Sequence, residues 1–186
     1  MAQVDLSGFR VAALVEDNFE QVEFTKPKAA WEAALAHVDL ISRHPELHGW
    51  RHRERGDEFR ANVVLAEADA ANYDALFLPG GVINGDALRM VAEAQQFARA
   101  LVAKKKPIAV ICHGGWLLIS AGLVQGRTLT SWPTLQDDYR NAGATWEDRE
   151  VVVDGNWVSS RKPDDIPAFS RAAIEVFTRA RQRRAA

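Results

Sequence analysis

Short apolar runs and amphipathic stretches alternate along the chain. Four runs are almost entirely apolar and are bounded by turn-forming residues, which is typical of strands buried on both faces of a parallel sheet. The most regular of them ends directly before the only cysteine. The expected strands cover Arg10–Val15, Val38–Ser42, Ala75–Leu78 and Ile108–Ile111.

Between these runs, apolar residues recur every three or four positions, which predicts helices packed on the sheet. A lysine run, Lys104–Lys106, follows the second helix and is expected to cap it in solvent, because the helix dipole favours cations at that end. The expected helices present Phe24, Trp31, Leu35 and Val38; then Leu88, Val91, Ala94, Phe97, Ala98 and Leu101; then Trp116–Ala121; and finally Phe169, Ala173, Val176, Phe177 and Ala180.

Three other stretches are less regular. His44–Asp57 is polar and interrupted by proline and glycine, so we expect either an irregular excursion or a hairpin. Thr128–Trp132 is a strand candidate, and Val151–Val158 contains an Asp-Gly pair between β-forming residues, which indicates a hairpin.

Strands that alternate with helices over the whole length predict an α/β fold. We expect a doubly wound, flavodoxin-like, mostly parallel sheet with helices on both faces, plus a small β-hairpin. At 186 residues the chain has the usual size of one domain, so the expectation is a single domain over residues 1–186.

Composition then narrows the functional classes. The 23 basic and 25 acidic side chains leave a net charge of −2, which gives no electrostatic reason to expect nucleic acid or an anionic membrane as a partner. No apolar run approaches the roughly 18 residues that a membrane helix needs, and the first residues lack the pattern of a secretory signal. We therefore expect a cytoplasmic protein.

Cys112 is the only cysteine, so an internal disulfide and a cysteine-rich zinc site are excluded. It lies between an expected strand and an expected helix, where Gly114 and Gly115 permit a sharp turn. In such folds this turn faces the functional crevice, and a helix N-terminus favours a thiolate. The alternative is a buried, unreactive cysteine that only packs.

His113 is a candidate base for this thiol. Side chains adjacent in sequence at a sharp turn usually diverge, so the alternative is that its ring faces the substrate rather than Cys112. No histidine follows His113 in the chain, which argues against a triad with a downstream histidine.

We expect neither a metal ion nor an organic cofactor. His44, His48 and His52 have metal-like spacing, but Pro45 and Gly49 would interrupt the helix needed to align them. The pair Gly80-Gly81 lacks the glycine pattern that binds dinucleotide phosphates. Among the six tryptophans, the two expected to line the site are Trp116 and Trp132.

Four blocks of the sequence, LFLPGG, AVICHGGWLLISAG, GRTLTSWP and VVVDGNWVSSRKPDDIPAF, resemble the DJ-1/PfpI superfamily, in particular its PfpI-like intracellular protease branch. They occur in the family's order and the likeness covers nearly the whole chain. The resemblance implies the fold shared with class I glutamine amidotransferases, a nucleophile elbow at the Cys-His-Gly block, and a homodimer or a hexamer built from dimers.

The resemblance also implies roles for individual residues. Cys112 matches the nucleophilic, oxidation-sensitive cysteine, and Glu23 matches the acid that hydrogen-bonds its sulfur. We expect Glu23 to be protonated, because burial raises the pKa of a carboxyl group and two adjacent anions would repel. Glu20 is the nearby rival for this role, and otherwise a solvated turn residue.

The remaining site residues are assigned in the same way. The backbone N–H groups of Gly81 and His113 match the family's oxyanion hole. In PfpI-like relatives an acid from a neighbouring subunit completes the histidine, and Asp86 is the closest match, although this loop departs from the usual pattern and Gly115 stands where many relatives carry proline. The alternative is that Asp86 caps the following helix. The expected lining of the site is Glu20, Gly80, Gly114, Trp116 and Trp132.

Two functions of different classes stay open. In the first, Cys112 attacks a small carbonyl compound, a glycated amine or a peptide, and the protein is a stress-linked hydrolase. In the second, Cys112 is oxidised under stress and the protein is a non-catalytic redox sensor or chaperone. A glutamine amidotransferase is excluded, because it needs a downstream His-x-Glu pair that this sequence lacks.

Overall fold

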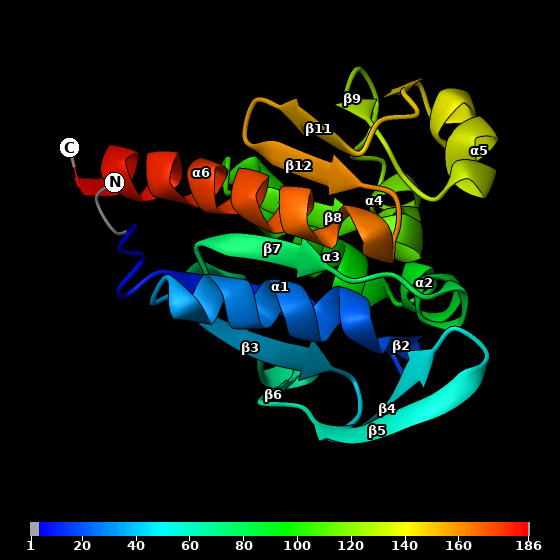
Figure 1. Cartoon of the computed structure of the whole chain (residues 1–186), viewed down its shortest axis with the longest axis horizontal. Coiled ribbons are helices and arrows are strands. Elements are labelled where there is room, and N and C mark those ends of the chain that lie inside the picture. Colours follow the sequence, from blue (N-terminus) through cyan, green and yellow to red (C-terminus); the bar gives the residue numbers. More distant parts are fainter. Residues whose placement is uncertain (1–3, 186) are drawn as a thin grey trace.

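A seven-stranded sheet forms the centre of the computed structural model, which describes residues 4–185 (Figure 1). Its strands are β1 (Arg10–Leu14), β3 (His37–Ser42), β6 (Val63–Val64), β7 (Ala75–Leu78), β8 (Ile108–Ile111), β11 (Val151–Asp154) and β12 (Trp157–Ser160). They lie in the order β11-β12-β8-β7-β1-β3-β6, and every neighbouring pair is parallel except β11 with β12.

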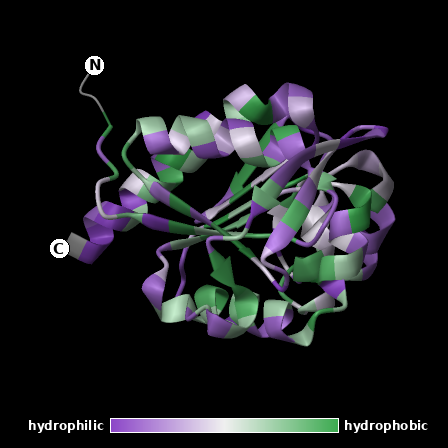
Figure 2. Ribbon diagram, turned by 90° about the horizontal axis from the view of Figure 1, so that it is seen from below, coloured by the Kyte–Doolittle hydropathy of each residue, from purple (hydrophilic) through white to green (hydrophobic). Residues whose placement is uncertain are grey.

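Helices cover both faces of this sheet, which confirms the expected α/β architecture. They are α1 (Gln21–Ala33), α2 (Val82–Arg89), α3 (Ala92–Ala103), α4 (Gly115–Ser120), α5 (Gln136–Asn141) and α6 (Ile166–Ala185). Helices α1 and α6 lie side by side on one face, and α3 packs on the other (Figure 1). Figure 2 shows largely hydrophobic strands in the centre of the molecule, between helices in which hydrophobic and hydrophilic residues alternate.

Alternate residues of each strand face opposite helical layers, as the two-residue period of a strand requires. In β8, Ala109 and Ile111 join the cluster that contains Trp31 of α1 and Phe177 of α6. Ile108 and Val110 join the second cluster, on the other face, with Phe97, Leu101 and Leu117. Both faces of the central strands are therefore buried, which explains why their sequences are continuous apolar runs.

Two smaller sheets accompany the main one. His44–Asp57 adopts the hairpin alternative: β4 (Glu46–Arg51) pairs with β5 (Glu54–Arg60), and β2 (Phe19–Glu20) joins β4. The strand expected over Thr128–Trp132 is only β9 (Thr128–Leu129), paired with β10 (Thr145–Trp146). The expected Asp-Gly hairpin is confirmed as β11–β12, which forms one edge of the main sheet.

Two helix expectations were wrong in detail. The first helix ends at Ala33; Leu35 adopts a φ of 70° with 54% of its surface exposed, and Val38 belongs to β3. The second helix is divided into α2 and α3 around Met90, although the expected apolar face from Leu88 onward is buried. In both cases the apolar spacing was real, but a local turn interrupted the helix.

The sheet topology places a crevice at one end of the strands. After β1 the chain adds β3 and β6 on one side of β1. It then crosses to the other side of β1, where it forms β7 and β8, so the strand order reverses at β1. Ligands in such sheets bind beyond the carboxyl ends of the strands at this reversal. Helix α2 and the β4–β5 hairpin lie at that end in Figure 1. No helix in the described part of the chain has the length and apolar character to cross a bilayer.

Candidate active site

Cys112 directly follows β8 and has a left-handed backbone, with a φ of 60°. Only a few per cent of non-glycine residues adopt this region, and such strain is concentrated at functional sites. A single tight turn, Cys112–Gly114, leads from the strand into α4. A side chain on Gly114 would collide with the carbonyl oxygens of Leu78 and Pro79, so this turn packs directly on the end of β7.

The ring of His113 contacts the thiol, with 3.1 Å between the Cys112 Sγ and the His113 Nδ1. Of the two alternatives, the structure has the ring facing Cys112 rather than away from it, because the left-handed residue followed by a tight turn brings the two side chains to the same side. Burial lowers the pKa of His113 to about 4, so the imidazole is neutral at pH 7. With the proton on Nε2, the Nδ1 lone pair can accept the thiol hydrogen.

Glu23 lies on the first turn of α1 and is completely buried. Burial raises the pKa of its carboxyl group to about 8, and the neighbouring charge of Glu20 adds to this shift. Neither carboxyl oxygen makes a well-formed hydrogen bond to a nitrogen or oxygen of the described residues. These surroundings favour a neutral carboxylic acid at pH 7, which is the protonation state that the sequence argument preferred.

Gly80 faces both this acid and the thiol. A Cβ at position 80 would overlap the Glu23 Oε2 and would lie 3.1 Å from the Cys112 Sγ. Both groups therefore lie against the position that a side chain of residue 80 would take. Only glycine leaves the space that this arrangement requires.

The thiol itself is harder to ionise than the sequence argument expected. Burial raises the pKa of Cys112, an ionised Glu23 would raise it further, and the backbone N–H groups of Gly81 and His113 lower it less strongly. The expected helix-dipole effect is weak because α4 has only six residues. Deprotonation of the Cys112 thiol therefore depends more on a proton acceptor beside the sulfur than on the N-terminus of α4.

Glu20 is not a solvated turn residue. It directly precedes α1, is buried, and accepts a hydrogen bond of 3.2 Å from the backbone N–H of His52 on the β4–β5 hairpin. Glu20 thus joins the hairpin to the turn before α1 and influences Glu23 only through its charge. Of the two glutamates, Glu23 is the one held against Cys112.

Asn84 organises the loop after β7, and sequence reasoning missed it. Its side chain is fully buried in α2 and donates to the carbonyl oxygens of Pro79 (3.1 Å) and Gly80 (2.9 Å), while its Oδ1 accepts from the Glu16 N–H (2.7 Å). It therefore links the ends of β1 and β7. The one available signal was an asparagine three residues after a glycine pair, which is too common to single out.

Gly81 requires its own conformation, with a φ of 95°. In this conformation the backbone N–H group of Gly81 is directed toward the Cys112 sulfur. The backbone N–H group of His113 is directed toward it as well. Helix α2 then packs closely on the nucleophile turn, because a side chain on Gly85 would collide with the His113 carbonyl oxygen. Two backbone donors thus converge where negative charge would develop.

Two tryptophans flank the histidine. The ring centroid of Trp116 lies 5.0 Å from that of His113, and the centroid of Trp132 lies 6.0 Å from it on a nearly parallel plane. The indole N–H of Trp116 donates to Asp138 over 2.8 Å, which fixes its orientation. These two aromatic rings limit the positions that the imidazole can take.

Asp86 stands apart from this cluster. It is exposed within α2, and its side chain makes no hydrogen bond or ion pair with another residue of the described chain. The alternative that it caps a helix was wrong, because Gly81 precedes α2 and Val91 precedes α3. Within one copy of the chain, the Asp86 carboxylate therefore makes no hydrogen bond or ion pair with His113.

The three histidines with metal-like spacing do not share a helix face. His44 lies at a bend, His48 on β4 and His52 in the hairpin turn. His48 instead contacts Asp17, with 3.3 Å between its Nδ1 and the carboxylate oxygen. Residues 4–185 contain no group of three potential ligands arranged around a metal position.

Gly115 and Tyr139 fit each other beside the nucleophile turn. A Cβ at Gly115 would fall on the Tyr139 hydroxyl and 2.8 Å from its Cζ. Tyr139 is fully buried, and its hydroxyl has no hydrogen-bond partner among the described residues. The aromatic ring of α5 thus occupies the space that a larger residue at the start of α4 would need.

Known proteins resemble this chain over most of its length. Residues 9–176 match the DJ-1/PfpI family. The chain is 37% identical over 168 residues to "Deglycase PfpI" of Pyrococcus furiosus, covering 90% of this chain and 99% of that protein. It is 39% identical over 173 residues to "Protein/nucleic acid deglycase 2" of Escherichia coli, covering 90% and 97%.

A bacterial relative carries a different description. The chain is 38% identical over 171 residues to "Putative cysteine protease YraA" of Bacillus subtilis, covering 90% of this chain and 98% of that protein. Among solved structures, Drosophila melanogaster DJ-1beta has a TM-score of 0.82 at 21% identity, covering 95% of this chain and 97% of that one. At this identity the structural likeness concerns the fold.

Proposed function

This chain belongs to the DJ-1/PfpI family, and from that membership we propose that it is a cysteine-dependent hydrolase that removes glycation adducts from amines. Relatives that match it over 90% of its length are named deglycases. The observation that carries the proposal is the 3.1 Å contact between the Cys112 sulfur and the neutral His113 imidazole.

The proposed reaction uses these groups in order. The Cys112 sulfur bonds to the carbon that carries the amine nitrogen and a hydroxyl group, its proton passes to His113 Nδ1, and His113 returns that proton to the amine as the carbon–nitrogen bond breaks. The hemithioacetal left on sulfur then shifts a hydrogen from this carbon to the neighbouring ketone carbon, which gives a thioester of lactic acid. Water attacks the thioester carbonyl, the N–H groups of Gly81 and His113 stabilise the negative oxygen, and hydrolysis frees lactate and the Cys112 thiol.

Glu23 supports the reaction without entering it. As a buried neutral acid it can donate a hydrogen bond toward the sulfur when the thiol has lost its proton. A second carboxylate at this position would repel the thiolate. The proposal therefore requires Glu23 to keep its proton while Cys112 reacts.

A redox sensor is the second candidate, and one observation favours it. The two backbone N–H groups directed at the Cys112 sulfur could equally bind an oxygen added to it by peroxide. Such a sensor needs oxidation of Cys112 but not turnover. The two functions differ in whether His113 is required.

We also propose that the protein acts inside the cell as a homodimer or as a hexamer built from dimers. Val82 and Ile83 of α2 and Met90 directly after it are exposed, the last with 80% of its surface accessible. These apolar side chains lie on or directly after the helix that carries Asp86. Their burial against a second copy would remove apolar surface from water and bring Asp86 toward that copy's site.

The test is release of free amine from a purified methylglyoxal adduct of N-acetyl-lysine. We expect turnover by the wild type, loss of at least about 100-fold in Cys112→Ser, and a comparable loss in His113→Ala. His37→Ala is the matched control, because His37 is exposed at the start of β3. A sensor would show peroxide oxidation of Cys112 with no turnover in any variant.

A second arm separates deglycation from removal of free methylglyoxal. The rate at which the adduct disappears is compared with its spontaneous release of methylglyoxal, measured with a trapping reagent. A faster enzymatic rate supports attack on the adduct itself. Equal rates would mean that the enzyme consumes free methylglyoxal, and the deglycase proposal would fail.

A further inference from the structure

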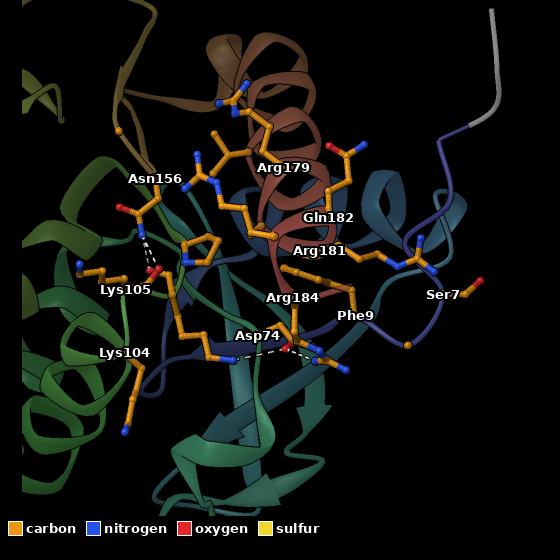
Figure 3. A pocket seen from close by; sticks show the side chains of 17 residues that line it. Ser7, Phe9, Asp74, Lys104, Lys105, Asn156, Arg179, Arg181, Gln182 and Arg184 are labelled. Carbon is orange, nitrogen blue, oxygen red and sulfur yellow. Dashed lines mark hydrogen bonds and ion pairs between the residues drawn. The ribbon is translucent and has the colours of Figure 1, made fainter. Parts of the chain in front are cut away.

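A cavity of about 830 Å³ lies at the amino ends of β7 and β8, opposite the nucleophile (Figure 3). Pro107 lines it and immediately precedes β8, whereas Cys112 immediately follows β8. At the rise of a strand, roughly 3.3 Å per residue, the two positions are about 16 Å apart. This cationic cleft, as we call it, is therefore separate from the candidate active site.

Two segments supply its positive charge. The Lys104–Lys106 turn lines one side, and the last turns of α6 line the other with Arg179, Arg181, Arg183 and Arg184. Figure 3 shows Arg179, Arg181 and Arg184 on the helix and Lys104 and Lys105 facing them across the cavity. One carboxylate, Asp74, lines the cleft among these cations.

Asp74 neutralises only part of this charge. Its Oδ1 pairs with Lys106 at 3.4 Å and with Arg184 at 2.5 Å. Arg181 donates to the backbone oxygen of Asp5 over 2.8 Å. Within residues 4–184, the other cations of the cleft make no ion pair: these are Lys104, Lys105, Arg179 and Arg183.

The lysine turn is held in place before any ligand arrives. The Asn156 side chain donates to the carbonyl oxygens of Lys105 and Lys106, both over 2.8 Å. Lys105 adopts a left-handed backbone, with a φ of 53°. A turn fixed in this way loses little backbone entropy when its side chains bind a ligand.

The floor of the cleft is apolar. Phe9, Pro107 and Val176 line it and are buried, and Ala180 lies beside them on α6. A hollow with an apolar floor and a cationic rim suits a ligand with an organic body and a highly charged end. Its volume is that of a site for one small molecule.

We infer that the cationic cleft binds an organic di- or triphosphate, such as a nucleotide. Arginine forks bind phosphate oxygens in pairs, and lysines add point charges that match a compact polyanion. A nucleic acid duplex is the less suitable occupant, because the cations surround a hollow rather than follow a stripe and the chain as a whole carries −2.

The experiment is calorimetric titration of the full chain with ATP, AMP, inorganic triphosphate and a short DNA duplex. We expect ATP to bind at one site per chain, at least about tenfold more tightly than AMP, because each added phosphate gains charge-assisted hydrogen bonds. Weaker binding of inorganic triphosphate than of ATP would show that the apolar floor contributes; equal binding would overturn the assignment of an organic ligand.

The test variant is Lys105→Gln with Arg179→Gln, which removes one cation from each side of the cleft. We expect its ATP affinity to fall about tenfold or more. The matched control, Lys26→Gln with Arg171→Gln, removes the same charge from exposed positions outside the cleft and should change affinity less than about twofold, as expected of a screened long-range effect.

Three further results would overturn the inference: no saturable ATP binding, an equal loss in the control variant, or tighter binding of the duplex than of ATP. Cys112→Ser keeps the outcome independent of the proposed hydrolase. That variant should retain full ATP affinity whether or not the wild type removes adducts from amines.

Discussion

The carboxyl group of Glu23 and the thiol of Cys112 meet in the space that a side chain at residue 80 would occupy, which Gly80 leaves empty. Glu23 is fully buried and Cys112 is 7% exposed, so the two groups share an environment in which a second negative charge is strongly disfavoured. The protonation state of Glu23 should therefore affect both the stability of the fold and the reactivity of Cys112.

Glu23→Gln should flatten the pH dependence of stability. The carboxyl group has a raised pKa of about 8 in the folded chain and an ordinary pKa in the unfolded chain, so stability is complete at acidic pH and falls as pH rises toward 8. The loss between pH 5 and 8.5 is on the order of 4 kcal/mol for the wild type. Chemical denaturation at both pH values measures it.

The glutamine variant should lose almost none of this stability, and Glu175→Gln, at an exposed position of α6, should behave like the wild type. If the wild type and Glu23→Gln lost stability in parallel between these pH values, Glu23 would have an ordinary pKa. The assumption that Glu23 is a neutral acid in the proposed reaction would then be wrong.

The acid limb of the pH–rate profile should lie near pH 4 rather than near 6.5. Burial lowers the pKa of His113 to about 4, and protonation below that value removes the lone pair that accepts the thiol proton. Initial rates of amine release between pH 3.5 and 8 measure this limb, with circular dichroism confirming the fold. An inflection between pH 6 and 7 would contradict a buried, neutral imidazole.

Gly80→Ala should abolish turnover and lower stability by about 1–3 kcal/mol, because the added methyl group overlaps the Glu23 carboxyl group and lies 2.5 Å from the Cys112 Cβ. Gly122→Ala is the control. It introduces a side chain at a positive φ with no neighbouring atom within 4 Å, so it should cost about 1–2 kcal/mol and leave turnover unchanged. Equal turnover in both variants would show that the space over Gly80 is not critical.

Asn84→Ala should destabilise the protein by about 2–4 kcal/mol, because it leaves buried partners in the Gly80 loop and at Glu16 unpaired. Alkylation of Cys112 by iodoacetamide should change in rate, since the loop carries one of the two N–H groups directed at the sulfur. Asn72→Ala, at an exposed position, should stay within about 0.5 kcal/mol of the wild type. An Asn84 variant with normal stability and alkylation would remove its positioning role.

The assembly is tested by mixing inactive variants. If Asp86 acts on the site of a second copy, Asp86→Asn and Cys112→Ser should each be inactive, and co-refolded mixtures should recover part of the wild-type turnover. Glu93→Gln, which neutralises an exposed acid on α3, should retain full turnover. Full activity of Asp86→Asn alone would end the case for a shared site.

Sequence alone predicted the framework well, because the framework depends on periodic burial. The apolar run Ile108–Ile111 had to be a central strand, and Cys112 had to lie at its carboxyl end. Leu35 shows the limit of this reasoning. Its spacing suits a helix face, yet the chain turns there and leaves the side chain in solvent.

The site was less predictable because it depends on tertiary contacts. The left-handed backbone of Cys112, which turns His113 toward the sulfur, is not encoded by any local glycine. The effect of burial on the thiol was underestimated, since the length of α4 and the packing around Cys112 could not be known. The cationic cleft needs α6 to end beside the Lys104–Lys106 turn, which no local pattern indicates.

The fit between Gly115 and Tyr139 has an evolutionary consequence. Because the tyrosine hydroxyl occupies the position of a Cβ at residue 115, neither residue can change freely while the other stays. A chain with proline or another larger residue at the first position needs a smaller one at the second. The two positions should therefore covary among relatives, and a proline can be introduced at 115 only in a background where Tyr139 has first been shortened.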